Sequence, residues 1–179
     1  MALEQVLNAT SVAVVGASKK ETKRGYQAIK TLLEQGFEGR IYPVNPKEKT
    51  ILGLPCHKQV SEIEGPVEMV LITTPAKTIP EILRDCGKKG VAGAVIIAGG
   101  FGEMGKAGKD LEKEIVGIAK ENGIRLIGPN TSGMMNLESN MNLVGLKDVP
   151  KGHIALISQS GNMALTLITE AAIKSRQGF

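Results

Sequence analysis

Residues 11–18 read SVAVVGAS, and this stretch decides the fold. The run SVAVV predicts a buried strand, because strands covered on both faces of a parallel sheet are continuously apolar. Gly16 permits a tight turn, and a helical pattern follows over residues 25–35, with Gly36 as its stop signal. A strand, a glycine turn and a helix form the phosphate-binding corner of a Rossmann-like unit, in which backbone amides face an anion.

The alternation of strand and helix continues along the chain. Short apolar runs predict strands at residues 41–44, 68–72, 94–98 and 125–127, and helical patterns cover residues 79–89 and 110–121. Strands that alternate with helices of this length indicate βαβ units, and right-handed crossovers then produce a doubly wound parallel sheet. We therefore predict an α/β fold in which residues 1–130 form one Rossmann-like domain.

The alternation stops after the fifth predicted strand. Residues 131–152 are rich in Asn, Met and Gly and are interpreted as a connector. We expect Met134, Met135 and Met141 to pack this connector against the first domain.

A second unit is predicted at the end of the sequence. Residues 153–157 (HIALI) predict a strand and residues 162–174 predict a helix. We interpret residues 153–179 as the first βα unit of a second, flavodoxin-like α/β domain. Because one strand and one helix cannot bury a core of their own, we expect the natural chain to continue after Phe179.

Composition disfavours several classes of protein. The formal net charge is +4, with three Phe, two Tyr and no Trp, so aromatic stacking platforms for nucleic acid are not expected. No signal peptide is recognised and no apolar run reaches the ~20 residues of a membrane helix, which predicts a cytoplasmic protein with no membrane partner. Cys56 and Cys86 are isolated and indicate neither a zinc site nor a disulfide, so no metal is expected.

The glycine turn alone does not identify its ligand. The dinucleotide fingerprint G-x-G-x-x-G is incomplete, because Ser18 stands where the second glycine belongs and the next glycine is Gly25. A glycine that only turns the chain stays open as an alternative. Basic residues of the following loop could supply charge to a pyrophosphate or could be solvated: Lys19, Lys20, Lys23 and Arg24.

The end of the second predicted strand is more informative. NAD-binding units place Asp or Glu there to accept hydrogen bonds from ribose hydroxyls. Here residues 44–47 read VNPK, and the next acid is Glu48, after Lys47. A lysine at this place suits a phosphate on the ribose, which coenzyme A carries at the 3′ position and NADP at the 2′ position.

Six motifs in order carry a family resemblance. They are VAVVGAS (residues 12–18), YPVNPK (42–47), TTPA (73–76), IIAGGFGE (96–103), GPN-x-x-G (128–133) and ISQSG (157–161). Together they resemble the N-terminal part of the NDP-forming (ADP-forming) acyl-CoA synthetases, which are relatives of the succinyl-CoA synthetase α subunit. The resemblance spans essentially the whole chain.

The resemblance implies a coenzyme A site at the first domain. Its contacts would be Gly16, Ala17, Ser18, Lys47, Pro75, Ala98, Gly99 and Gly100. All of these residues lie at or just after the carboxyl ends of predicted strands, where ligands of doubly wound sheets bind.

The SQSG sequence at residues 158–161 could begin a helix in either of two roles. A serine nucleophile requires the pattern G-x-S-x-G, but Ser158 occupies the position of the first glycine and no paired histidine and acid are identified. An anion site at a helix N-terminus is the simpler interpretation. The resemblance implies that Ser160 and Gly161 face the phosphate that these synthetases transfer.

In the similar synthetases, acyl-CoA, ADP and phosphate give the free acid, ATP and coenzyme A through a phosphorylated histidine. His57 and His153 match no such histidine loop, so we assign no catalytic residue to this chain. The resemblance places ATP/ADP and Mg in other synthetase domains or subunits, which would be the partners of a chain that binds coenzyme A or acyl-CoA. Two alternatives stay open: a coenzyme A-sensing module fused to an acetyltransferase, and an NADP-dependent oxidoreductase domain.

Overall fold

The computed structural model describes residues 3–175 and 178–179 and contains a five-stranded parallel sheet. The strands are β1 (Ser11–Val15), β2 (Arg40–Val44), β5 (Met69–Ile72), β6 (Gly93–Ile96) and β7 (Arg125–Ile127). Their spatial order is β2-β1-β5-β6-β7, and every neighbouring pair is parallel. The predicted Rossmann-like α/β fold is confirmed.

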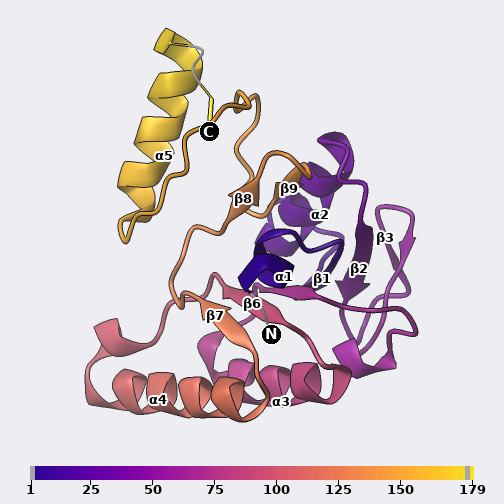
Figure 1. The fold of residues 1–179 in the computed structure, drawn as a ribbon. Coiled ribbons are helices and arrows are strands. Elements are labelled where there is room, and N and C mark those ends of the chain that lie inside the picture. Colours follow the sequence, from indigo (N-terminus) through magenta and orange to yellow (C-terminus); the bar gives the residue numbers. More distant parts are fainter. Residues whose placement is uncertain (1–2, 176–177) are drawn as a thin grey trace.

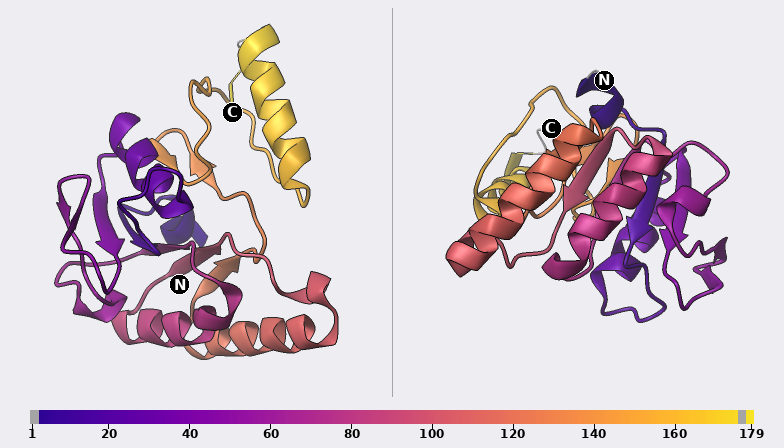
Figure 2. Two further views of the ribbon diagram at one scale, coloured as in Figure 1. Left: turned by 180° about the vertical axis from the view of Figure 1, so that it is seen from behind. Right: turned by 90° about the horizontal axis from the view of Figure 1, so that it is seen from below.

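Helices cover both faces of this sheet (Figures 1 and 2). Helices α3 (Ile79–Lys89) and α4 (Lys106–Glu121) lie side by side on one face, and α2 (Arg24–Glu34) lies on the opposite face together with the short α1 (Leu3–Leu7). The buried side chains accordingly form two core clusters, one on the α3–α4 face and one on the α2 face. Alternate residues of β1 enter the two clusters, as Val12 and Ala13 do, because successive strand residues point to opposite faces.

The strand order locates the crevice where a ligand binds. The connection from β1 leads to β2 on one side, whereas β5 and the later strands continue on the other side. Such a reversal opens a crevice at the carboxyl ends of the two central strands. Here those strands are β1 and β5, so the crevice lies between the loops that begin at Gly16 and Thr73.

Most predicted elements coincide with observed ones. The bounds of α3 and β7 are those predicted, while α4 begins four residues earlier than the predicted residue 110. Two small antiparallel hairpins were not predicted: β3 (Thr50–Ile51) with β4 (Leu54–Pro55), and β8 (Met135–Asn136) with β9 (Met141–Asn142). The connector is therefore partly structured.

The methionines of the connector lie in different surroundings. Met141 is fully buried in the α2-side core, and the half-buried Met134 packs against the same core, as predicted. Met135 is half-buried and, like Met134, lines a cavity next to the last helix.

The predicted strand at residues 153–157 is wrong. The segment has no strand pairing, and Ile157 is 98% exposed while Ile154 is 53% exposed. A strand needs a neighbour for its backbone groups, and no described segment pairs with this one. The predicted helix is present as α5 (Gly161–Glu170), continued by a π-helical turn over Ala171–Ser175, and it stands apart from the sheet (Figure 1). Each helix in the described ranges falls short of the length or hydropathy of a membrane span.

Candidate functional site

The turn after β1 is built by two glycines. Gly16 has φ +87°, and a Cβ placed there would lie 2.6 Å from Thr73 Oγ1. A Cβ on Gly25, the second residue of α2, would lie 2.3 Å from the carbonyl oxygen of Gly16. Both distances are impossible for a real side chain, so the start of α2 packs directly on the turn. Gly25 therefore performs the close-packing role of the third fingerprint glycine, at a longer spacing than the motif prescribes.

Asn45 joins the turn to the loop after β2. Its Nδ2 donates to the carbonyl oxygen of Ala17 at 2.7 Å, and its Oδ1 accepts from the backbone N–H of Lys47 at 2.9 Å. Ala17 is fully buried, while the Lys47 side chain is exposed. From the sequence, Asn45 was noted only because it stands where an NAD-binding unit would have an acidic residue. Its role in joining the two loops was missed.

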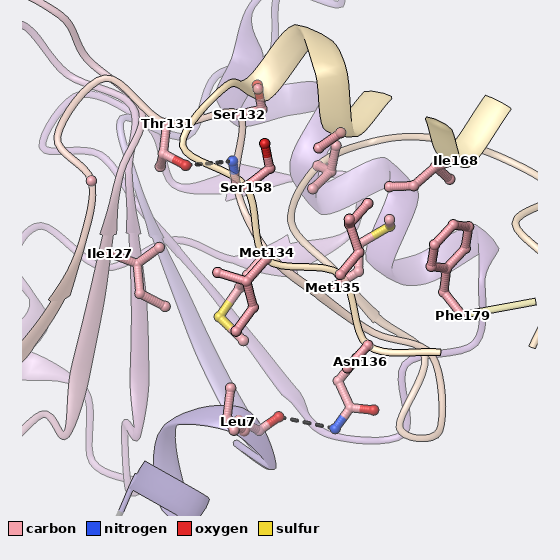
Figure 3. A pocket seen from close by; sticks show the side chains of 18 of the residues that line it. Leu7, Ile127, Thr131, Ser132, Met134, Met135, Asn136, Ser158, Ile168 and Phe179 are labelled. Carbon is pink, nitrogen blue, oxygen red and sulfur yellow. Dashed lines mark hydrogen bonds between the residues drawn. The ribbon is translucent and has the colours of Figure 1, made fainter. Parts of the chain in front are cut away.

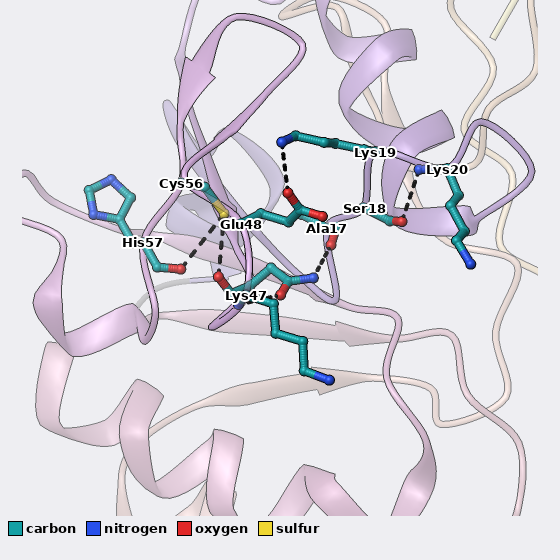
Figure 4. Close-up of polar contacts among 9 residues, drawn as sticks. Ala17, Ser18, Lys19, Lys20, Lys47, Glu48, Cys56 and His57 are labelled. Atoms are coloured by element: carbon teal, nitrogen blue, oxygen red, sulfur yellow. Dashed lines mark hydrogen bonds and ion pairs between the residues drawn. The ribbon is translucent and has the colours of Figure 1, made fainter.

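Charged side chains surround this pair of loops (Figure 4). Lys19 Nζ lies 2.9 Å from Glu48 Oε2, so the first acid after β2 is paired with a lysine of the turn loop. Ser18 Oγ accepts from the backbone N–H of Lys20 at 3.1 Å. Glu48 is thus engaged by a cation, which disfavours its use as an acceptor for ribose hydroxyls.

The loops after β5 and β6 meet at the same edge of the sheet. Thr73 Oγ1 donates to the carbonyl oxygen of Val15 at 3.0 Å, which ties the end of β5 to the end of β1. Pro75 is exposed and precedes a short 3₁₀ turn. Gly100 has φ +105°, and a Cβ there would lie 3.1 Å from the Ala76 side chain. The backbone of the second loop therefore approaches the first closely.

Glu103 closes the loop after β6. Its Oε1 accepts from the backbone N–H of Gly100 at 2.5 Å. Backbone hydrogen bonds, first of all that from Gly100, lower the pKa of this exposed carboxyl. Gly99 is exposed and Ala98 half-buried, and the carbonyl of Ala98 accepts from the N–H of Asn130 at 3.0 Å.

The structure thus brings the predicted first-domain contacts to one edge. Those after β1, β5 and β6 are linked through the Gly16–Thr73 and Ala76–Gly100 approaches, and Asn45 adds Lys47 to them.

Ser160 and Gly161 lie elsewhere, at the start of α5. Ser160 is the N-cap, and its Oγ accepts from the N–H of Met163 at 3.3 Å. Gly161 faces the loop after β7, where a Cβ would lie 2.2 Å from Ser132 Oγ. Between α5 and that loop lies an open cavity of about 1380 Å³, which Ser158 and Gly161 also line (Figure 3). The predicted anion site at α5 therefore adjoins a cavity that the Gly16 turn does not line.

The interpretation of Arg24 as a pyrophosphate contact requires its side chain to face the turn loop, and it does not. Its Nη2 instead donates to the backbone carbonyls of Ser132, Leu143 and Val144 at 3.0, 3.2 and 2.5 Å. Burial lowers the pKa of this guanidinium.

The two cysteines and two histidines lie in different surroundings. Burial raises the pKa of the Cys86 thiol to about 12, and burial also raises the pKa of the half-buried Cys56. His57 contacts Tyr42 edge-on with ring centroids 5.9 Å apart, and His153 is exposed. Within residues 3–175 and 178–179, no group of three or more His, Cys, Asp or Glu side chains could hold a metal.

Comparison with solved structures identifies similar folds. The dinucleotide-forming acetyl-coenzyme A synthetase 1 of Ca. Korarchaeum cryptofilum, solved in complex with phosphate and ADP, superposes with a TM-score of 0.93 at 38% sequence identity, covering 98% of this chain and 38% of that one. A structure from Pyrococcus horikoshii, PH0766, matches with a TM-score of 0.93 at 39% identity, covering 99% and 40% of the two chains.

Curated relatives agree with the structures. The chain is 43% identical over 178 residues to the α subunit of acetate–CoA ligase (ADP-forming) II of Pyrococcus furiosus, covering 99% of this chain and 38% of that subunit. It is 46% identical over 170 residues to acetate–CoA ligase (ADP-forming) of Methanocaldococcus jannaschii, covering 94% and 23%. The chain thus spans about two fifths or less of the length of these relatives. The CoA binding domain model matches residues 10–136, and the chain belongs to this CoA binding domain family.

Proposed function

We propose that this chain is the coenzyme A-binding portion of an ADP-forming acyl-CoA synthetase. The whole enzyme would convert acyl-CoA, ADP and phosphate into the free acid, ATP and coenzyme A. The observation that carries the proposal is the joining of the Gly16 turn to Lys47 through Asn45 at the topological switch point. The relatives named as ADP-forming acetate–CoA ligases support the reaction class.

The nucleotide part of coenzyme A would bind between the loops after β1 and β2. Backbone amides of residues 16–18 and the N-terminus of α2 would hold the pyrophosphate, because a helix N-terminus favours negative charge. Lys47, with its exposed ammonium group, would hold the ribose 3′-phosphate. Pro75 and the Ala98–Gly100 loop would line the continuation of the site. The absence of side chains at Gly16 and Gly25 lets the start of α2 pack directly on the turn, where the anion would bind.

The rest of the reaction would require groups that this chain does not match. We assign the phosphorylated histidine, the ADP/ATP site and Mg to other domains or subunits, since the relatives extend well beyond the matched part. Ser160 and Gly161 would present the N-terminus of α5 to the phosphate that is transferred. The N-cap geometry of Ser160 is compatible with this role, because the first N–H groups of a helix have no intrahelical acceptor and the Ser160 side chain engages only that of Met163 among the described contacts.

A panel of ligands tests the proposal. We expect coenzyme A to raise the Tm of the protein, with NAD and NADP giving no shift at the same concentration. Stabilisation by NADP but not by coenzyme A would overturn the proposal in favour of an oxidoreductase domain. The reading frame downstream of Phe179 separates ligase from sensor, because an encoded acetyltransferase fold there would contradict the ligase.

A further inference from the structure

Arg24 makes three side-chain hydrogen bonds to distant segments of the described chain. It is the first residue of α2 and directly follows the loop of the Gly16 turn. One terminal nitrogen, Nη2, donates to three carbonyl oxygens that lie 108 to 120 residues further along the chain. The guanidinium is half-buried, so these carbonyls replace much of its hydration.

The segment that Arg24 holds is itself ordered by side-chain bonds. The buried Asn142 accepts with its Oδ1 from the N–H groups of Val144 and Gly145, at 3.0 and 2.8 Å. Its Nδ2 donates to Gln35 Oε1 at 2.8 Å, at the other end of α2. Residues 142–146 are therefore fastened to both ends of the helix that begins at the nucleotide turn.

Ser132 links this arrangement to α5. Its carbonyl accepts from Arg24, while its side chain occupies the space into which a Cβ on Gly161 would project. A continuous path of contacts thus runs from the Gly16 turn, through Gly25 and Arg24, to Ser132 and the N-terminus of α5. The path connects the two candidate anion sites, although they share no cavity.

We propose that Arg24 is a positioning residue that couples occupancy of the nucleotide site to the placement of the N-terminus of α5. This inference rests on the proposed function, because it takes coenzyme A as the ligand at the turn. An anion bound at the start of α2 orders residues 16–24 and so fixes the origin of the Arg24 side chain. The three carbonyls, and with Ser132 the start of α5, are then held in one arrangement. By linkage, an anion bound at α5 strengthens coenzyme A binding to the same extent.

Hydrogen exchange of the full-length protein, with and without saturating coenzyme A, tests the coupling. We expect coenzyme A to slow exchange in residues 132–146 of the natural sequence by about fivefold or more, the lower range of measured site-to-site couplings. Arg24→Met should abolish this remote protection while coenzyme A still protects residues 16–24. Arg24→Lys should restore part of it, because an ammonium can reach some of the carbonyls. Lys30→Met, on the same helix, removes an ion pair with Glu34 at 3.7 Å. This variant is the control and should behave like the natural sequence.

The possible outcomes separate the two proposals. If the natural sequence shows no protection at residues 16–24 and no binding of coenzyme A, the proposed function fails. If coenzyme A binds and protects residues 132–146 equally in the Arg24→Met and natural proteins, the coupling role of Arg24 fails.

A second pair of variants covers the case in which Arg24→Met does not fold. Gly161→Ala places a methyl group 2.2 Å from Ser132 Oγ and 3.3 Å from Ser132 Cβ, so the hydroxyl must rotate and the contact must loosen; this variant should weaken the effect of coenzyme A on exchange in α5. The double variant Ser132→Gly with Gly161→Ala makes room for that methyl group and should restore the effect. An unchanged response of α5 in Gly161→Ala would overturn the proposed path.

Discussion

The contact between α2 and the nucleotide turn yields the sharpest prediction. Gly25→Ala adds a Cβ that would lie 2.3 Å from the Gly16 oxygen, 2.8 Å from the Gly16 carbonyl carbon and 2.9 Å from Ala17 Cα. All three are backbone atoms, so no side-chain rotation relieves the collision. The start of α2 must move away from the turn.

The sign of the stability change distinguishes this contact from an ordinary helical glycine. Replacing a solvated helical Gly by Ala stabilises a protein by about 0.5–1 kcal/mol, whereas overpacking costs about 1–3 kcal/mol. We expect Gly25→Ala to lower the free energy of unfolding by roughly 1–2 kcal/mol, which corresponds to a Tm decrease of about 2–8 °C. Coenzyme A affinity should fall about tenfold, because a helix N-terminus contributes up to ~2 kcal/mol to a bound anion.

Gly117→Ala is the matched control. Gly117 lies within α4, and a Cβ placed there would meet no described atom within 4 Å apart from the neighbouring backbone of the helix itself. This variant should gain about 0.5–1 kcal/mol and bind coenzyme A normally. Urea unfolding and isothermal titration calorimetry measure both quantities. If Gly25→Ala were stabilised as Gly117→Ala is, with unchanged coenzyme A affinity, the close packing of α2 on the turn would be refuted.

Three further predictions concern single side chains. Asn45→Ala removes the hydrogen bond that joins the loops after β1 and β2, and also the bond to the Lys47 N–H within the second loop. Calorimetry should show coenzyme A affinity falling about tenfold, at roughly 1 kcal/mol per bond. Glu48→Gln releases Lys19 from its ion pair, so coenzyme A should bind about two- to fivefold more tightly at low salt. This gain should disappear at high salt, because salt screens the charge of Lys19. An unchanged affinity at low salt would show that Lys19 stays away from the ligand. Burial raises the pKa of Cys86 to about 12, so its thiol should resist a thiol reagent at pH 8 until urea unfolds the protein. The free energy of unfolding should fall as the pH rises from about 9, because the thiol ionises in the unfolded chain before it does in the native one. Rapid labelling of this thiol in the native protein would contradict its burial.

The sheet could be predicted because each of its strands is marked by a short local pattern in the sequence. Continuous apolar runs such as those at β1 and β5 mark strands buried on both faces, and glycines such as Gly36 and Gly123 mark helix ends with positive φ. The hairpins of two-residue strands carry too few residues for any periodic pattern. Their pairing depends on the backbone at turns such as Leu52–Gly53, where φ is +49° and +81°.

The conformation of residues 153–157 and the arrangement of the candidate site depend on contacts between residues that are far apart in the sequence, so no local pattern predicts them. The run at residues 153–157 is as apolar as a core strand, but pairing with a neighbour decides whether such a run becomes a strand. The role of Arg24 could not be predicted from its place in a lysine-rich loop, since its acceptors are backbone carbonyls more than a hundred residues away. Gly25 was recognisable in principle as a displaced fingerprint glycine, but only the approach of α2 to the turn shows its function.

The most direct test of the central claim is the ratio of the Kd values for dephospho-coenzyme A and coenzyme A, measured by calorimetry in the natural protein and in Lys47→Met. The two ligands differ only by the ribose 3′-phosphate, and an exposed charged pair contributes about 1 kcal/mol. We predict that the natural protein prefers coenzyme A by about fivefold, and that Lys47→Met binds both ligands equally. Equal affinities in the natural protein, or an undiminished preference in Lys47→Met, would contradict the assignment of this site to the nucleotide of coenzyme A with Lys47 as its phosphate contact.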